Sequence, residues 1–356
     1  MAMETQVRVT PVPASAVGRA KSFKSSGAGA DAVSWRDEQI HLFCGDSLER
    51  YKSWERPDVI VSDGGYGILG FEGDTPDHLG LPEWYEPHIE EWSKYASAKT
   101  TLWFWNSEIG WAVVHPVLEK FGWRYVNCNI WHKGKAHIAG NVNTEKIRRF
   151  PVVTEVCAHY VFEEKIDNLT LKDWLLKEWK RTGLPLRKAN EACGVKDAAT
   201  RKYLDKGRMW YFPPPEMFGK MADYANKYGD QSGAPYFSRN GKTPMGAAEW
   251  SKMRAVFNCP FGYTSVWERG ALHGKERVRS PNGGSKAAHL NQKPLDLMRL
   301  IIEASSHPGD VIWEPFGGLF SASLAAKLTR RKAFACEIDP DYFMLGVSRF
   351  KEIPLF

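Results

Sequence analysis

The segment Val311–Glu337 is the part of this chain that most constrains its fold. A short apolar strand pattern precedes Gly317 and Gly318. A helix pattern and a second strand pattern follow, ending on the acid Glu337. Nucleoside-binding units of parallel sheets have this order, because glycines let the backbone approach the ligand and an acid after the second strand can bind ribose hydroxyls. The segment therefore predicts a nucleoside-cofactor site, with an ordinary tight turn at the two glycines as the alternative.

Strand and helix patterns also alternate elsewhere, on both sides of a long middle segment. The strand patterns lie at 39–44, 57–63, 100–105, 124–131 and 152–162, and the helix patterns lie at 81–96, 109–121 and 295–305. Such alternation predicts an α/β fold. The domain boundaries we expect are a disordered tail at 1–33, one half of the α/β domain at 34–165, an insert at 166–285 and the second half at 286–356.

The composition is compatible with a nucleic-acid partner but does not require one. The formal net charge is +6, and the chain holds 15 Trp, 13 Tyr and 18 Phe, whose rings can stack on bases or fill a core. The six cysteines are scattered, without a CxxC or Cys/His cluster, so we expect no metal site and a reducing compartment. No signal-peptide or membrane-spanning pattern is present, and we expect a cytoplasmic protein without a membrane partner.

The stretch from His289 to Tyr342 carries the most specific signal. Its two motifs read His289-Leu290-Asn291-Gln292-Lys293-Pro294 and Pro308-Gly309-Asp310-Val311-Ile312-Trp313-Glu314-Pro315-Phe316-Gly317-Gly318. They resemble the H-x-x-Q-K-P and P-G-D-x-V-x-D-P-F-x-G-x-G-T motifs of the DNA amino-methyltransferases of restriction-modification and orphan methylation systems. The resemblance implies S-adenosylmethionine as the cofactor. The residues that it places at the cofactor site are Asp63, Asn291, Gln292, Lys293, Glu314, Phe316, Gly317, Gly318 and Glu337.

Two residues depart from this family pattern. Glu314 stands where the family has Asp, and Phe320 stands where it has a second glycine. The side chain of Phe320 either crowds the methionine part of the cofactor or packs away under the following helix.

The loop Asp63-Gly64-Gly65-Tyr66 follows a buried strand pattern and resembles the family's D-P-P-Y or S-P-P-Y catalytic loop, with both prolines replaced by glycine. An exocyclic amino group is a poor nucleophile, because its lone pair is delocalised into the ring. Asp63 and the Gly64 carbonyl can accept its hydrogens and free that lone pair, while Tyr66 stacks on a base flipped out of the duplex. Taken alone, the loop also fits an ordinary turn. Glycine does not preset the backbone as proline does, so we expect the surroundings to hold this loop.

The order of the motifs resembles one group within the family. The catalytic loop comes first, the insert second and the cofactor motif last, as in the β group, whose members carry a target-recognition region in the gap. The resemblance implies the S-adenosylmethionine-dependent methyltransferase fold. This is an α/β fold with a mostly parallel seven-stranded sheet, helices on both faces and a target-recognition insert at 166–285.

Two segments are candidate DNA contacts. Residues 186–204 show a helix, a turn at Gly194 and a second helix that Asp197 can cap, a pattern typical of a helix-turn-helix and also of a small helical hairpin. A basic loop after residue 132 either clamps phosphates or forms a solvated face. The residues predicted to contact DNA are Lys133, Lys135, Arg148, Arg149, Arg187, Arg201 and Lys202.

Together these patterns predict site-specific methylation of adenine N6 in double-stranded DNA, because Asp63 favours adenine in this family. Cytosine N4 is the alternative target, and a DNA-binding homologue that lost activity through Gly64, Gly65 and Phe320 is the alternative without catalysis. RNA methylation is a further alternative, which the helix-turn-helix candidate disfavours. A monomer or homodimer and a cognate restriction endonuclease are compatible with the sequence.

Overall fold

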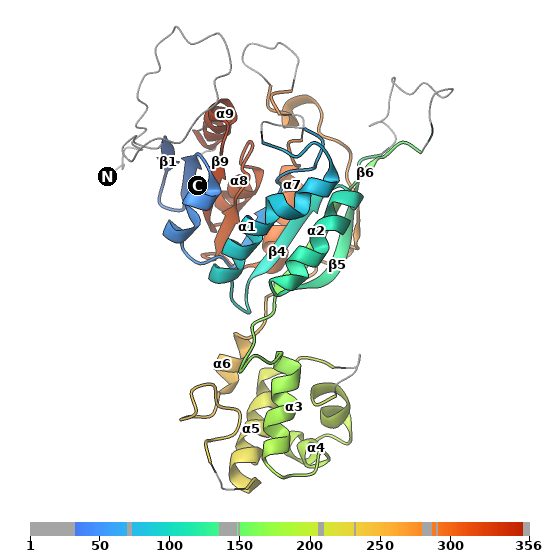
Figure 1. The fold of residues 1–356 in the computed structure, drawn as a ribbon, viewed down its shortest axis with the longest axis vertical. Helices are drawn as coiled ribbons and strands as arrows, with labels where there is room; N and C mark the ends of the chain where they lie inside the picture. Colours follow the sequence, from blue (N-terminus) through green and yellow to red (C-terminus); the bar gives the residue numbers. More distant parts are fainter. Residues whose placement is uncertain are drawn as a thin grey trace.

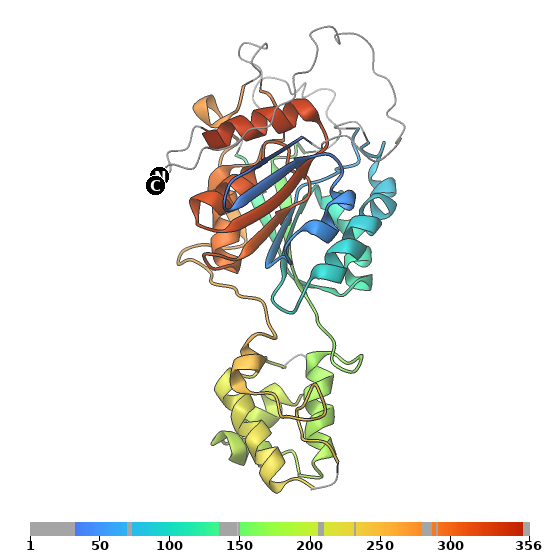
Figure 2. The same cartoon turned by 90° about the vertical axis from the view of Figure 1, so that its left-hand side faces the viewer.

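A computed structural model describes residues 33–69, 73–134, 148, 150–205, 210–230, 233–279, 287–289 and 291–351. Figure 1 shows a large body with helices around a central sheet and a smaller helical body, joined by extended connections. Figure 2, turned by 90°, shows the same separation. Residues 1–32 of the expected tail lie outside the described part of the chain.

The large body is built on a sheet of nine strands in the order β1-β2-β9-β8-β3-β4-β6-β5-β7. The strands are β1 (Ser34–Arg36), β2 (Ile40–Cys44), β3 (Val59–Ser62), β4 (Thr101–Asn106), β5 (Trp123–His132), β6 (Thr154–Phe162), β7 (Val266–Glu268), β8 (Val311–Glu314) and β9 (Lys332–Glu337). Neighbouring strands are parallel, except that β1 is antiparallel to β2 and β6 is antiparallel to β4 and β5.

The mostly parallel α/β sheet is confirmed, but it has nine strands rather than the expected seven. The two additional strands are the edges β1 and β7. Each has three residues, of which only the central one is buried. Such short segments carry no strand periodicity, which is why the sequence did not indicate them.

Helices cover both faces of the sheet, as expected. α1 (Leu81–Tyr95) and α2 (Glu108–Lys120) pack on one face, and α7 (Leu295–Ser305), α8 (Ser321–Leu328) and α9 (Pro340–Lys351) pack on the other. Side chains of a strand alternate between faces, so Ile60 of β3 joins the first layer while Val59 and Val61 join the second. β3 is thereby buried on both sides, and the loop that follows it begins at the carboxyl edge of the sheet.

Short 3₁₀ turns complete the large body: η1 (Ser47–Glu49), η2 (Tyr51–Ser53), η3 (His78–Gly80) and η6 (Gly274–Glu276). None of the helices in the described ranges is long and apolar enough to cross a membrane.

The smaller body consists of α3 (Leu171–Arg181), α4 (Lys188–Cys193), the π-helical turn η5 (Ala199–Tyr203), α5 (Pro215–Tyr228) and α6 (Ala247–Ser251). It has its own core, which includes the buried rings of Trp174, Trp179, Phe218 and Trp250. The predicted insert, 166–285, extends too far at its carboxyl end, because β7 lies within that range and pairs with β5 of the large sheet. The Gly-, Ser- and Pro-rich composition around β7 hid this return to the sheet.

Candidate active site

The predicted catalytic loop, residues 63–66, lies at the carboxyl edge of the sheet. It continues from β3, between the parallel strands β4 and β8. Ligands of open α/β sheets bind at this edge. Neighbouring side chains hold the loop, since the Gly65 carbonyl accepts hydrogen bonds from the Tyr85 hydroxyl at 3.0 Å and from the Asn106 side chain at 2.8 Å.

Asp74 fixes the residues that follow the loop. Its carboxylate accepts hydrogen bonds from the backbone N–H groups of Gly67 at 3.0 Å and Ile68 at 3.1 Å. Together with the bonds to Gly65, these contacts restrain a loop that has glycine where the family has proline. The expected support from the surroundings is therefore present.

Gly64 has no room for a side chain. A Cβ atom built on it would lie 2.7 and 2.8 Å from two ring carbons of Phe316 and 2.9 Å from the Tyr85 hydroxyl. Phe316 belongs to the cofactor motif, and its ring centroid lies 5.2 Å from that of Trp84 and 4.9 Å from that of His88, both in α1. The glycine thus lets the catalytic loop and the cofactor loop approach each other.

One carboxylate oxygen of Asp63 already has two donors. Lys293 Nζ donates to Oδ1 at 2.7 Å, and the Tyr66 hydroxyl donates to the same oxygen at 3.0 Å. Lys293 comes from the H-x-x-Q-K-P motif, and its side chain is only 1% exposed. These donors orient the carboxylate and leave Oδ2 as the oxygen that can accept a hydrogen from a ligand.

Glu155, near the start of β6, is a site residue that the motifs did not indicate. Its Oε2 lies 3.4 Å from Lys293 Nζ, and its Oε1 lies 2.5 Å from Lys133 Nζ. Carboxylates and ammonium groups therefore alternate in the order Asp63, Lys293, Glu155, Lys133. We call these four residues the charged row.

Burial and pairing set the protonation of the charged row. Burial lowers the pKa of Lys293, but the charges of Asp63 and Glu155 outweigh it and hold that pKa above its usual value. Burial raises the pKa of Glu155, but the ammonium groups of Lys293 and Lys133 outweigh it and hold that pKa below its usual value. Burial, with the charge of Asp63, raises the pKa of Tyr66 well above its usual value. Near neutral pH, Lys293 and Glu155 are therefore charged and Tyr66 is a donor.

The glycine loop after β8 forms the second part of the site. The Gly318 N–H donates to Glu337 Oε2 at 2.6 Å, and the Gly317 N–H donates to the Cys336 carbonyl at 2.6 Å. Gly318 has φ +51°, a left-handed conformation that favours glycine. Glu337 ends β9 and is buried, and this burial raises its pKa to about 7. The glycine loop and the acid therefore lie side by side.

The surroundings of Gly318 fit a nucleoside cofactor. A Cβ atom on Gly318 would lie 3.5 Å from the nearest atom of the His289 ring, and the buried Nδ1 of that ring has no hydrogen-bond partner within the described ranges. The Tyr342 ring centroid lies 4.7 Å from that of His289. A buried acid, an unused ring nitrogen and aromatic faces suit ribose hydroxyls and a flat base.

Phe320 packs away under the helix, which is the second of the two alternatives for this residue. It has φ 54° and ψ 46° immediately before α8 and is fully buried. Its ring centroid lies 5.8 Å from that of Phe343, and a Cβ atom on Gly346 would lie 2.5 Å from its ring. The side chain therefore fills the space between the glycine loop and α9.

Two residues predicted at the cofactor site make contacts within the protein. Both carboxylate oxygens of the buried Glu314 accept hydrogen bonds from backbone N–H groups at the start of α8, at 2.9 and 2.7 Å. The Gln292 side chain bonds the backbone of residues 276 and 278 at 2.9 and 3.0 Å. Asn291 is exposed, and its carbonyl accepts a hydrogen bond from Lys293. Glu314 and Gln292 thus hold neighbouring loops in place.

The residues predicted to contact DNA fall into three groups. Lys135 and Arg149 lie outside the described residues. Lys133 does not present its ammonium group at the surface, because this group pairs with Glu155 and the side chain is 13% exposed. The exposed members are Arg148, Arg187, Arg201 and Lys202.

The helix-turn-helix expected at 186–204 is only partly formed. α4 and η5 flank Gly194, whose φ of 68° makes the turn, but η5 is a single π-helical turn of five residues. The first N–H groups of η5 donate to the Asn190 side chain, whereas the Asp197 carboxylate pairs with Arg201 at 3.1 Å. A recognition helix must extend along the major groove, so the structure favours the small helical hairpin.

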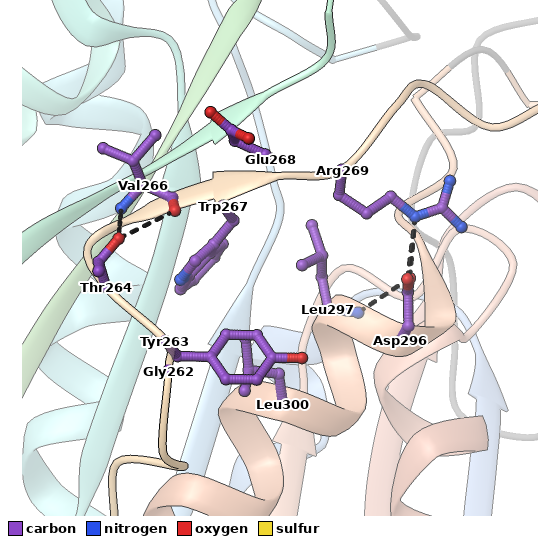
Figure 3. A pocket seen from close by; sticks show the side chains of 10 residues that line it. All are labelled: Gly262, Tyr263, Thr264, Val266, Trp267, Glu268, Arg269, Asp296, Leu297 and Leu300. Atoms are coloured by element: carbon purple, nitrogen blue, oxygen red, sulfur yellow. Dashed lines mark hydrogen bonds and ion pairs between the residues drawn. The ribbon is translucent and has the colours of Figure 1, made fainter.

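A cavity of about 510 Å³ lies between β7 and α7, at the edge of the sheet (Figure 3). The rings of Tyr263 and Trp267 line it, and Arg269 pairs with Asp296 at 3.0 Å on its wall. None of its lining residues belongs to the catalytic loop or the glycine loop. A smaller cavity, of about 290 Å³, has Glu155 in its wall and adjoins the charged row.

Besides Glu155, three residues that support the catalytic loop were not predicted. Asn106 ends β4 at the same sheet edge as Asp63, so a polar residue closing a strand pattern was the available signal. Tyr85 and Asp74 had no comparable signal, because the folded chain alone brings them to the loop.

Comparison with known proteins agrees with these motifs. The family model N6_N4_Mtase, described as DNA methylase, matches residues 57–347. The chain is 36% identical over 89 residues to the type II methyltransferase M.HinfI of Haemophilus influenzae and 41% identical over 61 residues to the DNA adenine methyltransferase YhdJ of Escherichia coli. The two matching segments make up 25% and 17% of this chain, and they span only 24% and 21% of the length of the two relatives, respectively.

A solved structure shares the fold. The PvuII DNA methyltransferase, described as cytosine-N4-specific, matches with a TM-score of 0.52 and 12% identity, and the match covers 89% of each chain. At this level of identity the likeness concerns the arrangement of helices and strands.

Proposed function

This chain belongs to the N6_N4_Mtase family of DNA methylases, and we propose that it transfers a methyl group from S-adenosylmethionine to an exocyclic amino group of a base in double-stranded DNA. One observation carries the proposal. Asp63 stands at the carboxyl end of β3 with Oδ1 fixed by Lys293 and Tyr66, on the sheet edge that also holds the glycine loop and Glu337.

The catalytic loop acts by accepting the hydrogens of the amino group. Asp63 Oδ2 accepts one hydrogen and the Gly64 carbonyl accepts the other, which favours a tetrahedral nitrogen with a free lone pair. The Gly65 carbonyl is already engaged by two side chains, so Gly64 is the better acceptor. Positive charge that develops on the nitrogen lies beside the Asp63 carboxylate, which stabilises it. The half-buried ring of Tyr66 supports a base flipped out of the duplex.

The glycine loop holds the methyl donor. When bound, S-adenosylmethionine supplies a methyl group activated by its sulfonium. Glu337 accepts hydrogen bonds from ribose hydroxyls, while His289 and Tyr342 form the wall beside Gly318. The close approach of Gly64 and Phe316 brings the donor site and the acceptor loop together, and such alignment contributes strongly to group transfer.

We further propose adenine N6 as the target atom, with cytosine N4 as the alternative. Asp63 matches the Asp form of the family's catalytic loop, and one relative is named a DNA adenine methyltransferase. The solved structure with the same fold is described as cytosine-N4-specific, so the fold alone does not distinguish the two. Mass spectrometry of nucleosides from methylated DNA separates them. N6-methyladenine is the expected product, and N4-methylcytosine would overturn this choice of base.

The smaller helical body is proposed to contact DNA and to contribute to the choice of site. It lies between the two motifs, where β-group members carry a target-recognition region. Arg187, Arg201 and Lys202 are its exposed candidates for phosphate contacts. A cognate endonuclease and the choice between monomer and homodimer stay predictions from the sequence.

Transfer of isotope-labelled methyl groups to mixed-sequence DNA tests the activity. We expect labelled DNA with the wild-type chain and with Glu86→Gln, which removes only an exposed ion pair with Lys120. We expect none with Asp63→Ala. A folded wild-type chain that labels no DNA would contradict the proposed methyl transfer and favour the alternative of an inactive DNA-binding homologue.

A further inference from the structure

We propose that Glu155 is a positioning residue for methyl transfer, because it holds Lys293 so that one defined oxygen of Asp63 faces the target amino group. This inference rests on the proposed function, since the orientation of Asp63 matters only if Asp63 is the catalytic carboxylate. The four groups of the charged row come from separate parts of the chain: the loop after β3, the segment before α7, β6, and the residue that follows β5.

Lys293 decides which oxygen of Asp63 is available. Lys293 Nζ contacts oxygens in three different segments, two of them by hydrogen bonds and the third as an ion pair. They are Asp63 Oδ1 at 2.7 Å, the Asn291 carbonyl at 3.3 Å and Glu155 Oε2 at 3.4 Å. With these partners the ammonium stays on the Oδ1 side, and Oδ2 is left for the amino group.

Without the charge of Glu155, Asp63 would be the only carboxylate of the charged row beside Lys293. The ammonium group would then move toward Asp63 and share both carboxylate oxygens. It would compete with the target amino group for Oδ2. Glu155 therefore acts by restraining Lys293.

Charge, rather than a directed hydrogen bond, is what Glu155 contributes. Its Oε2 lies 3.4 Å from Lys293 Nζ without satisfying hydrogen-bond geometry, so this contact is an ion pair. Its Oε1 is bound by Lys133 at 2.5 Å, which fixes the side chain in a site where it is 13% exposed. A neutral amide of the same shape cannot replace an ion pair, whereas a shorter carboxylate can do so in part.

Steady-state kinetics of Glu155→Gln, Glu155→Asp and the control Glu86→Gln test the proposal. For Glu155→Gln we expect kcat to fall on the order of 10- to 100-fold, as displacement of a reacting group does, with the KM values for DNA and S-adenosylmethionine close to wild type. Glu155→Asp should recover part of kcat, and Glu86→Gln should keep all of it. A wild-type kcat for Glu155→Gln, or a loss confined to KM, would overturn the proposal.

A double-mutant cycle in thermal stability tests the shared ammonium group without using activity. Asp63→Asn and Glu155→Gln each leave Lys293 with one carboxylate, but the double variant leaves it with neither. We expect the double variant to lower the unfolding midpoint by about 2–4 °C more than the sum of the two single changes. Additive changes would overturn the inference.

These two experiments also separate this inference from the proposed function. If the wild-type chain methylated no DNA but the cycle were non-additive, the sharing of Lys293 by Asp63 and Glu155 would be supported. The proposed methyltransferase activity would be contradicted. If Glu155→Gln does not fold, Lys293→Arg provides the second variant, because a guanidinium spreads the charge over a planar fork. It should lower kcat with KM retained, and a wild-type kcat would contradict the inference.

Discussion

A Cβ atom on Gly64 would lie 2.7 Å from the ring of Phe316. The catalytic loop after β3 and the cofactor loop after β8 thus meet where the first loop has a glycine and the second has an aromatic ring. A proline at position 64 would place its ring in the space that Phe316 occupies. In this chain any side chain at position 64 would therefore require the Phe316 ring to move.

Gly64→Ala should lower both stability and methyl transfer. The Phe316 ring cannot yield easily, since it is packed against Trp84 and His88 of α1. Overpacking of this kind costs about 1–3 kcal/mol of unfolding free energy. Gly270→Ala is the matched control, because a Cβ atom there has nothing within 4 Å. Denaturant unfolding of both variants checks the prediction, and wild-type stability for Gly64→Ala would contradict it.

The sequence predicted the central part of the fold and of the site. Seven of the nine strands showed apolar runs, and the motifs around Asp63 and Gly318 lie on one sheet edge as expected. These features are local in sequence: a buried strand, a turn residue and a helix follow each other directly. Local patterns can therefore identify them.

The sequence could not show contacts that only folding creates. Glu155 reaches Lys293 across the sheet, and Asp74 and Tyr85 support a loop from other segments. The same holds for Lys133, whose basic neighbourhood suggested phosphate contact although the folded chain pairs it with Glu155. Pairings between distant residues decided each of these roles.

Phe320→Gly, which restores the family residue, should destabilise the protein. The left-handed backbone of Phe320 costs about 1–2 kcal/mol, whereas removing a fully buried phenyl ring costs about 3–5 kcal/mol. The loss of the buried ring outweighs the relief of backbone strain, so we expect a net loss of about 1–4 kcal/mol in unfolding free energy. Arg330→Gly relieves the same backbone strain at an exposed position without removing a buried ring, so it should keep or raise the unfolding free energy. If Phe320→Gly were more stable than wild type, the relief of backbone strain would exceed the loss of the buried ring, contrary to this prediction.

Affinity for S-adenosylmethionine should rise with pH through the titration of Glu337. Burial raises the pKa of this carboxyl group to about 7, so it is largely protonated below that pH and ionised above it. Ribose hydroxyls donate to the ionised form, and binding is therefore linked to proton release. Between about pH 6 and about pH 8, calorimetry should show affinity increasing by up to about tenfold. Glu337→Gln should remove this dependence; a wild-type affinity independent of pH would contradict the assignment.

Lys202→Ala should weaken DNA binding without changing the preferred site. Lys202 is exposed in η5, where its charge can meet a phosphate. Loss of one phosphate contact reduces the slope of log Kd against log salt concentration by about 1. Lys94→Ala, on α1, removes an exposed lysine that pairs with Glu90 and Glu91 and serves as the control. Equal salt slopes for Lys202→Ala and wild type would contradict a phosphate contact by Lys202.

The single-turnover rate of methyl transfer by Asp63→Asn tests the central claim most directly. The substitution keeps the shape of the side chain but removes the charged acceptor at the end of β3, while Glu155 remains beside Lys293. We predict a rate lower by about 100- to 1000-fold, as for loss of one stabilising group at a reacting centre, with binding of S-adenosylmethionine retained in calorimetry. A rate close to that of the wild-type chain would contradict the assignment of residues 63–66 as the catalytic loop.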